Sequence, residues 1–377
     1  MGASEYDRQA SFRIRGSNWL CRLLIGVVVA VAASCATSPT GEKAEGLQTE
    51  NVIIVVIDGI RYSETWGAVP GIIPNMSTDL LRKGTLCRNF RNDGYTYTNS
   101  GHAAITTGVN QPIDNYGDEL PANPSMFQQW LKQKGRPATA AWIISSKDKL
   151  DILGNTLRPD WKDQFVPSLN CGVSGPGSGY RADSLTLVEV MKVLATHRPN
   201  LLLINFMEPD GYAHAGNWDY YLRGIARSDR YVKQLWDFLE KDAHYKGRTT
   251  LLVTTDHGRH LDSVKNGWID HGDDCKGCQH ISLLALGPDF RRDAIVETEY
   301  TLVDISATVS RMLDFEMDST VLVPRVDTVV VDLAMDTTLT ALPKDSIRLE
   351  VKMDTTVRKG NVMKDLFSRK ALKQMGL

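Results

Sequence analysis

The feature that most constrains the fold is an alternation, from Asn51 onward, of short apolar runs with longer amphipathic stretches. The first run, Val52–Ile57, is entirely β-branched, which is typical of a strand buried on both faces of a parallel sheet. The alternation predicts an α/β fold with a mainly parallel central sheet and helices on both faces. Further strands are expected at Ala138–Ile144, Leu201–Phe206, Thr250–Thr255 and Ile281–Leu286, and helices at Met76–Lys83, Ser125–Lys134, Ser184–Thr196, Trp218–Asp242 and Val303–Leu313.

Two segments interrupt this pattern. Residues 155–182 are rich in Gly, Pro and Ser, and we expect a loop or small cap over the site. Residues 320–357 are rich in Val, Thr and Asp, which predicts a peripheral β excursion, and the basic end 358–377 predicts a helix or a frayed tail. The sequence therefore predicts one main domain over residues 51–319 and a peripheral C-terminal extension over 320–377.

The N-terminus has the pattern of an export signal. Arg13, Arg15 and Arg22 precede the apolar run LLIGVVVAVAA at 23–33, which is too short to cross a bilayer as a helix of about 20 residues. The small residues before Cys35 resemble a bacterial lipoprotein signal, in which that cysteine carries the lipid. This predicts a signal peptide over 1–35, a flexible tether over 36–50, and a lipid-anchored protein on the periplasmic face of a membrane or on the cell surface. Cleaved soluble export and an uncleaved anchor remain alternatives.

The charge balance limits the classes of partner that the protein can bind. The chain has 43 basic and 45 acidic residues and no basic patch, which argues against nucleic-acid binding.

Without the signal, four cysteines remain, at Cys87, Cys171, Cys275 and Cys278. An oxidising compartment would allow disulfides, but the pairing stays open. The CxxC pair at Cys275 and Cys278 is consistent with a small disulfide, free thiols or metal ligands.

Acidic residues and histidines follow the predicted strands. An aspartate after a strand is more often a helix cap than a ligand, so the order of the whole set carries the argument. The carboxyl ends of parallel strands meet at one edge of a sheet, so these side chains are expected to converge. Carboxylate and neutral imidazole suit zinc, with manganese or iron possible. The set is Asp58, Asp210, His214, Asp256, His257 and His271.

This order resembles the alkaline phosphatase superfamily, and most closely its nucleotide pyrophosphatase/phosphodiesterase and Thr-nucleophile phosphatase branches. The stretch EPDGYAHAGN at 208–217 closely matches a Glu-Pro-Asp…His element of that branch. The resemblance implies a three-layer α/β/α sandwich with two divalent metal ions, expected to be zinc. It implies that Asp210, His214 and His271 bind one ion. It also implies that Asp58, Asp256 and His257 bind the other, together with the nucleophile.

The resemblance also points to the nucleophile. In the family it lies shortly before a Gly-His pair and a downstream Thr-Gly, and Gly101–His102 with Thr107–Gly108 places Thr98 there. Coordination to a metal would activate the Thr98 hydroxyl, and a phosphothreonine intermediate would follow. The amides of the following helix would favour an anion. The alternative is that Thr98 only caps that helix.

Threonine at this place favours phosphate over sulfate esters. Sulfatases of the superfamily oxidise a Cys or Ser in a Cys-x-Pro-x-Arg element to an aldehyde. The stretch TNSGH at 98–102 lacks the Pro and Arg, and oxidation of its threonine would yield a ketone. The sequence thus predicts a phosphodiesterase or phosphatase that acts on a small phosphorylated substrate. A phosphotransferase, mutase or phosphonate hydrolase, a sulfatase-like hydrolase and an inactive cell-surface binding module are the alternatives.

Three further residues bear on the substrate. Asn115 resembles the asparagine that this branch uses to contact a phosphate oxygen. Lys147 and Lys149 resemble the Lys-x-Arg element of Thr-nucleophile monoesterases, with Lys149 in place of Arg. Arg grips phosphate through two donors and Lys acts as a point charge, so the replacement is not neutral. The lysines favour a monoester and the element around Asp210 favours a diester, which leaves both possibilities open.

Overall fold

Among the described residues, nine strands form a central sheet in the order β4-β3-β5-β1-β6-β7-β2-β8, with β9 pairing β2. The computed structural model describes residues 46–68, 71–331 and 346–377, and of 324–331 and 346–351 it describes the backbone alone. The strands are β1 (Asn51–Ile57), β2 (Gly84–Arg91), β3 (Ala141–Ser145), β4 (Ser168–Cys171), β5 (Leu201–Phe206), β6 (Thr249–Thr254), β7 (His280–Leu286), β8 (Ala294–Val296) and β9 (Tyr300–Thr301).

The sheet is mixed but mostly parallel, as predicted. β1 lies at its centre and runs parallel to β5 and to β6. β7 runs antiparallel to both of its neighbours, β6 and β2. The edge strand β4 pairs parallel with β3, so part of the predicted loop at 155–182 extends the sheet. Strand β2 is hard to predict from the sequence because Arg88 and Asn89 interrupt its apolar residues. At the same place the register between β2 and β7 shifts.

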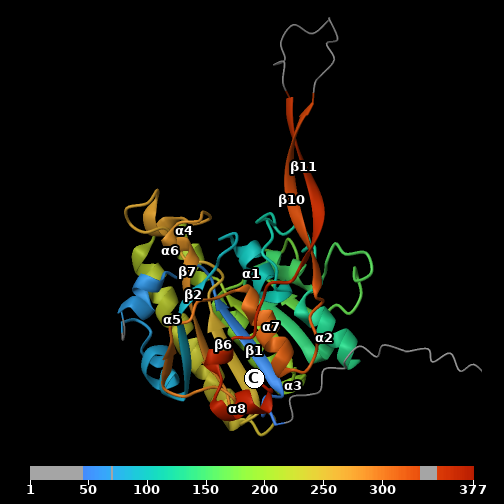
Figure 1. The fold of residues 1–377 in the computed structure, drawn as a ribbon. Helices are drawn as coiled ribbons and strands as arrows, with labels where there is room; N and C mark the ends of the chain where they lie inside the picture. Colours follow the sequence, from blue (N-terminus) through green and yellow to red (C-terminus); the bar gives the residue numbers. More distant parts are fainter. Residues whose placement is uncertain (1–45, 69–70, 332–345) are drawn as a thin grey trace, which may run out of the picture. The chain divides into compact units, whose positions relative to one another are not determined.

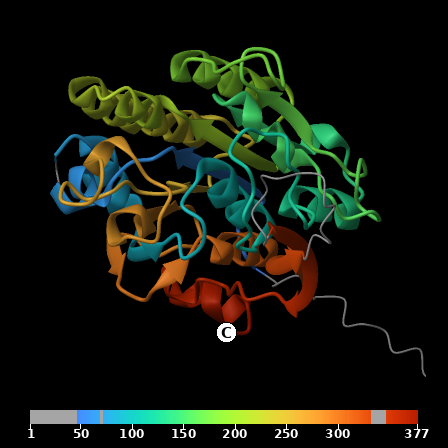
Figure 2. The ribbon, with the colours of Figure 1, turned by 90° about the horizontal axis from the view of Figure 1, so that it is seen from above.

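Side chains of β1 alternate between two hydrophobic cores, which is what makes the fold three-layered. Val52, Ile54 and Val56 pack into one core with residues of α1, α2 and α7. Ile53, Val55 and Ile57 pack into the other with residues of α3 and α5. Figures 1 and 2 show α5 and α7 on opposite sides of β1. The helices are α1 (Thr98–Thr107), α2 (Met126–Lys134), α3 (Asp183–Thr196), α4 (Glu208–His214), α5 (Trp218–Lys241), α6 (Lys276–Gln279), α7 (Val303–Met312) and α8 (Arg369–Gln374).

The predicted β excursion is an antiparallel hairpin. Strands β10 (Thr320–Val331) and β11 (Ser346–Val357) pair only with each other among the described strands. The Asn123 side chain pairs with the backbone of Leu322 at 2.6 and 2.8 Å. After the hairpin, Met363, Leu366 and Phe367 are buried in the first core, and α8 follows. The basic end therefore forms a helix and contributes to the core.

Two predicted elements differ in detail from the structure. The predicted helix at Met76–Lys83 is a π-helical turn at Asn75–Leu80 followed by a 3-10 turn at Leu81–Lys83. The predicted strand at Ala138–Ile144 begins only at Ala141, because a 3-10 turn follows Pro137. Hydrophobic periodicity does not distinguish these tighter or wider turns from regular elements.

The predicted signal peptide with Cys35 lies outside the described residues, as does most of the predicted tether at 36–50. Within the part of the chain that the structure describes, no helix combines the length and the apolarity needed to cross a bilayer.

Candidate metal-dependent active site

The central strands bring the predicted ligands to one edge of the sheet. Asp58 follows β1 and is fully buried, and Asp256 and His257 follow the neighbouring strand β6. On the other side of β1, strand β5 leads into α4, which carries Asp210 and His214. His271 comes from the loop before α6, and its ring stacks on that of His257. Adjacent parallel strands place their carboxyl ends side by side, which explains the convergence.

One group consists of Asp58, Asp256 and His257, whose ligand atoms lie within 4.8 Å of one another. His257 Nε2 is 3.6 Å from Asp58 Oδ1 and 3.5 Å from Asp256 Oδ2. Both His257 Nε2 and Asp256 Oδ2 are buried without a hydrogen-bond partner. Leaving buried polar atoms unpaired costs about 1–3 kcal/mol each. A cation between them would satisfy both atoms, so this group fits a metal.

The second group is centred on Asp210. Asp210 Oδ1 lies 3.2 Å from His214 Nε2 and 3.5 Å from His271 Nε2. The Nε2 atoms of His214 and His271 are 3.0 Å apart. His257 also belongs to this group, because a set of Asp210, His257 and His271 has ligand atoms within 4.8 Å. His214 lies at the rim with its side chain 43% exposed, whereas His271 is buried.

Hydrogen bonds fix the two buried imidazoles in the tautomer that a metal ligand would need. The Nδ1 atom of His257 donates to the Gly258 carbonyl at 2.9 Å, and that of His271 donates to the Thr96 carbonyl at 2.8 Å. A carbonyl can only accept, so each Nε2 carries the lone pair that faces the carboxylates. Burial lowers the pKa of both histidines to about 3, so the rings are neutral. Lone pairs facing carboxylates indicate a place for a cation.

Thr98 is the first residue of α1, and Tyr97 occupies the capping position without a side-chain hydrogen bond. The Thr98 hydroxyl is buried and lies 3.5 Å from Asp58 Oδ1. Other hydroxyls of this turn bond to backbone groups: Thr96 donates to the Asp273 carbonyl, and Ser100 pairs with the backbone of Ile113. Thr98 is therefore the hydroxyl that faces the two groups of candidate ligands, and it does not cap the helix.

Lys147 lies between the two groups. Its Nζ is 3.0 Å from Asp58 Oδ2 and 2.7 Å from Asp210 Oδ2, and it donates to Thr98 Oγ1 at 3.1 Å. Burial disfavours the charged ammonium, but the surrounding carboxylates outweigh burial and raise the pKa of Lys147. Burial also opposes ionisation of Asp210, yet Lys147 and the neighbouring cationic groups hold its pKa well below the usual range. The pair is therefore charged.

Asn115 and Lys149 lie together near the start of α1. Lys149 Nζ donates to Asn115 Oδ1 at 2.8 Å, and the same oxygen accepts the backbone N–H of Asn99 at 3.2 Å. Burial, and then the charge of Lys147, lower the pKa of Lys149 to about 8. A ligand with anionic oxygens could replace the Asn115 oxygen as partner of both donors.

Three residues that support the site were not predicted as members of it. Arg259 is fully buried, contacts Asp210 Oδ1 and lies 3.3 Å from His214 Nδ1, and it donates to the carbonyls of Trp268 and Ile269. The Asn205 amide donates to Asp58 Oδ2 at 3.1 Å. His102 Nδ1 bonds the Thr98 carbonyl at 2.8 Å. Asn205 could have been noticed as the polar residue in the run LLLINF.

His280, which follows the CxxC pair, lies away from this site. Its ring stacks on Tyr62 at 4.1 Å between centroids, and its Nε2 bonds the Arg88 carbonyl at 3.1 Å. Among the described residues it belongs to none of the groups with metal-ligand spacing. His271 is therefore the histidine of this loop that reaches the site.

Comparison with known proteins gives a family and a fold. A model of the Sulfatase family matches residues 50–315. No curated protein matches the sequence significantly. The fold is similar to that of the alkaline phosphatase PafA, with a TM-score of 0.53 and 12% identity over 85% of this chain and 99% of that one.

Two other solved structures are similar in fold. The lipoteichoic acid synthase LtaP from Listeria monocytogenes has a TM-score of 0.53 and 12% identity over 87% of this chain and 89% of that one. Murine ectonucleotide pyrophosphatase/phosphodiesterase 5 has a TM-score of 0.50 and 16% identity over 71% of this chain and 96% of that one. There is also a structure of an inactive variant of this murine protein, in which a threonine is replaced by alanine and AMP is bound.

Proposed function

The chain belongs to the Sulfatase family, within the alkaline phosphatase superfamily, and on that premise we propose that it is a metal-dependent phosphoric-ester hydrolase with Thr98 as its nucleophile. One observation carries the proposal. The Thr98 hydroxyl is buried, has no capping role, and faces the Asp58 carboxylate and the Lys147 ammonium. The inactive Thr→Ala variant of the murine relative, described with AMP bound, supports a threonine that acts on phosphorus.

The two groups of ligands are suited to two divalent cations, which we propose are zinc. Asp58, Asp256 and His257 would hold one, and Asp210, His214 and His271 the other. When bound, the cations would lower the pKa of the Thr98 hydroxyl and neutralise charge on the transferred phosphoryl group. The neutral state of His257 and His271 and their fixed tautomers are the properties that such ligands need.

The side chains around Thr98 define the expected chemistry. The Thr98 hydroxyl gives up its proton and Oγ1 attacks phosphorus. The bond from phosphorus to the ester oxygen breaks, and that oxygen takes up one proton in turn, so the leaving group departs as an alcohol. Water then cleaves the phosphothreonine and restores the hydroxyl. The Asn99 N–H at the start of α1 and the Lys147 ammonium would stabilise the phosphoryl oxygens.

We propose a phosphomonoester as the preferred substrate. Lys147 and Lys149 are both buried near Thr98, and a terminal phosphate carries more charge than a diester. Burying two ammonium groups is expensive unless anions compensate for them. Lys147 already has two carboxylate partners, whereas the partners of Lys149 are the backbone and side-chain oxygens of Asn115. An anionic phosphate oxygen would be a stronger partner for Lys149 than an amide oxygen.

A cleft of about 530 Å³ beside Lys149 is our proposed place for the leaving group. Tyr116, a residue that is 85% exposed, lies at this cleft next to Asn115 and offers an aromatic surface. Four aspartates also line it, which disfavours a leaving group with further negative charge. They are Asp118, Asp148, Asp151 and Asp163.

The test is to assay the purified protein with nitrophenyl phosphate, bis-nitrophenyl phosphate and nitrophenyl sulfate side by side. We expect the monoester to be turned over fastest and the sulfate slowest. A preference for the sulfate would contradict the assignment of Thr98. Product that forms only with an added alcohol acceptor would show a transferase, which is the chemistry of a synthase such as LtaP.

We also propose export and lipid attachment at Cys35, on the basis of the sequence pattern around it. Labelled palmitate should be incorporated into the protein in a bacterial host and be lost in Cys35→Ala. Incorporation that persists in the variant would exclude Cys35 as the lipidated residue.

A further inference from the structure

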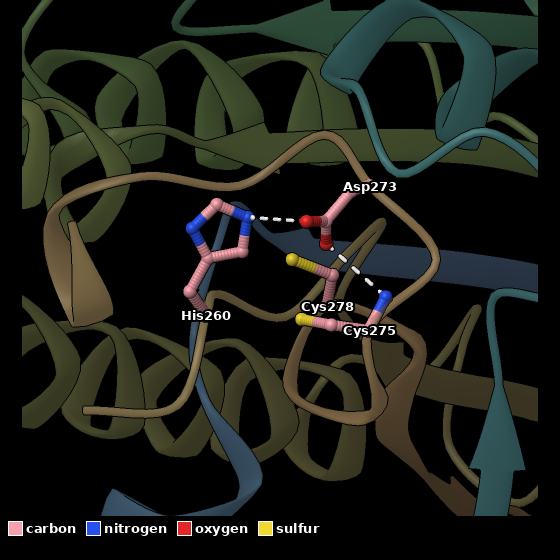
Figure 3. Close-up of side chains that lie close together, drawn as sticks. All are labelled: His260, Asp273, Cys275 and Cys278. Carbon is pink, nitrogen blue, oxygen red and sulfur yellow. Dashed lines mark hydrogen bonds and ion pairs between the residues drawn. The ribbon is translucent and has the colours of Figure 1, made fainter. Parts of the chain in front are cut away.

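A third group of residues with metal-ligand spacing lies outside the proposed active site. His260, Asp273, Cys275 and Cys278 each offer one ligand atom, and these atoms all lie within 4.8 Å of one another. Figure 3 shows the two sulfur atoms and the carboxylate directed toward the His260 ring. We propose that these residues bind a structural Zn²⁺ ion, distinct from the pair expected at Thr98.

The donor set matches structural zinc. Two cysteine sulfurs, one imidazole and one carboxylate give four protein ligands, and structural zinc sites are tetrahedral and closed in this way. The sulfurs also separate this group from the proposed active site, whose ligands are oxygens and nitrogens. Two thiolates and a carboxylate around Zn²⁺ leave one excess negative charge. The Lys265 ammonium, 2.7 Å from Asp273 Oδ2, would balance it.

The His260 ring provides an independent observation. The residue is buried, and neither of its ring nitrogens makes a hydrogen bond of good geometry, although Nε2 lies 3.2 Å from Asp273 Oδ2. An imidazole buried without hydrogen bonds costs free energy. A metal ion between His260, the carboxylate and the sulfurs would supply the missing partner.

Backbone contacts hold together the segments that carry this group. Gly258 N–H donates to the Cys278 carbonyl at 2.7 Å, and His260 N–H donates to the Asp270 carbonyl at 3.0 Å. The Asp273 carboxylate accepts the N–H of Cys275 at 3.1 Å. Gly258 and Gly277 allow the two segments to touch, because a Cβ on either would collide with the opposite backbone. The ligands are therefore preorganised.

The position of the site suggests what it does. The loop between Gly258 and Cys278 carries Arg259 and His271, both of which lie against Asp210. A zinc ion that ties His260 to Asp273, Cys275 and Cys278 would close this loop at its base. It would thereby position His271 without touching the substrate.

The test uses the full-length protein reconstituted with Co²⁺ in place of zinc. A thiolate-to-cobalt charge-transfer band in the near ultraviolet reports only this site, because the proposed active site has no sulfur ligand. We expect the band in the wild type, its loss in Cys275→Ser and in Cys278→Ser, and one metal ion fewer per chain in each variant. Cys87→Ala, which removes a buried thiol elsewhere, should keep the band.

Two results would overturn the site. One is a wild-type protein that binds Co²⁺ but shows no charge-transfer band. The other is a Cys275–Cys278 disulfide, found by mass spectrometry of the unreduced protein as isolated, because a disulfide removes both thiolate ligands. Both readouts are independent of ester hydrolysis, so a wrong assignment of the function leaves this test intact.

Discussion

The rings of His257 and His271 stack with their centroids 3.7 Å apart and their planes 17° apart. His257 follows β6 and His271 comes from the loop before α6, so the stack joins the two proposed metal sites through direct ring contact. Two protonated rings could not stack so closely. Burial keeps both neutral, and each directs Nε2 toward carboxylates of the site.

Removing the proposed nucleophile tests the central assignment. Thr98→Ala should lower kcat by at least about 10³-fold, because no other hydroxyl of the turn faces the ligand groups. Metal content should be unchanged, since carboxylates and imidazoles hold the ions. Thr96→Ala is the matched control, because the Thr96 hydroxyl donates to the Asp273 carbonyl instead of facing the ligand groups. Equal activity in Thr98→Ala and the wild type would rule out Thr98 as the nucleophile.

Chelation should inactivate the enzyme and destabilise it. Without cations, Asp256 Oδ2 and His257 Nε2 stay buried without partners, so we expect both hydrolysis and Tm to fall on treatment with a chelator. Addition of Zn²⁺ should restore both. Metal analysis and thermal unfolding measure this. Full activity in protein shown to be free of metal would refute the proposed chemistry.

Lys149 should give the enzyme a specific pH dependence. Burial lowers its pKa to about 8, so the ammonium is charged below this pH and neutral above it. Bound divalent cations would lower the pKa further, so KM for a phosphomonoester should begin to rise at or below that pH. In Lys149→Arg the side chain stays charged, so this rise should disappear. In Lys149→Met, KM should be high and independent of pH over the same range.

Arg259 should support the site through Asp210. Arg259→Met removes a buried charged partner of Asp210 and leaves the carbonyls of Trp268 and Ile269 unpaired. Breaking a buried charge pair in this way typically costs about 3–5 kcal/mol of unfolding free energy. Arg88→Met, which breaks an exposed ion pair with Glu297, should leave stability nearly unchanged. Denaturant unfolding compares them, and equal stability of the two variants would contradict this role.

Much of the fold is readable from local pattern. The β-branched run at Val52–Ile57 predicts β1, and helical periodicity over Trp218–Asp242 predicts α5 to within one residue. The strands that the sequence does not predict are those without a strong hydrophobic period. β2 carries polar residues at a register shift, and β4 lies in a stretch rich in Gly and Ser, so neither differs clearly from a loop in sequence.

The sequence by itself determined which side chains stand at strand ends, because strand and helix periods are local properties of the chain. It also supplied the chemistry of those side chains. Only the tertiary structure decided which of them meet. It set the Thr98 hydroxyl against Asp58 rather than in a cap, placed Arg259 on Asp210, and gathered His260 with the CxxC pair. Such contacts depend on how distant strands pair and loops return, which no local period encodes.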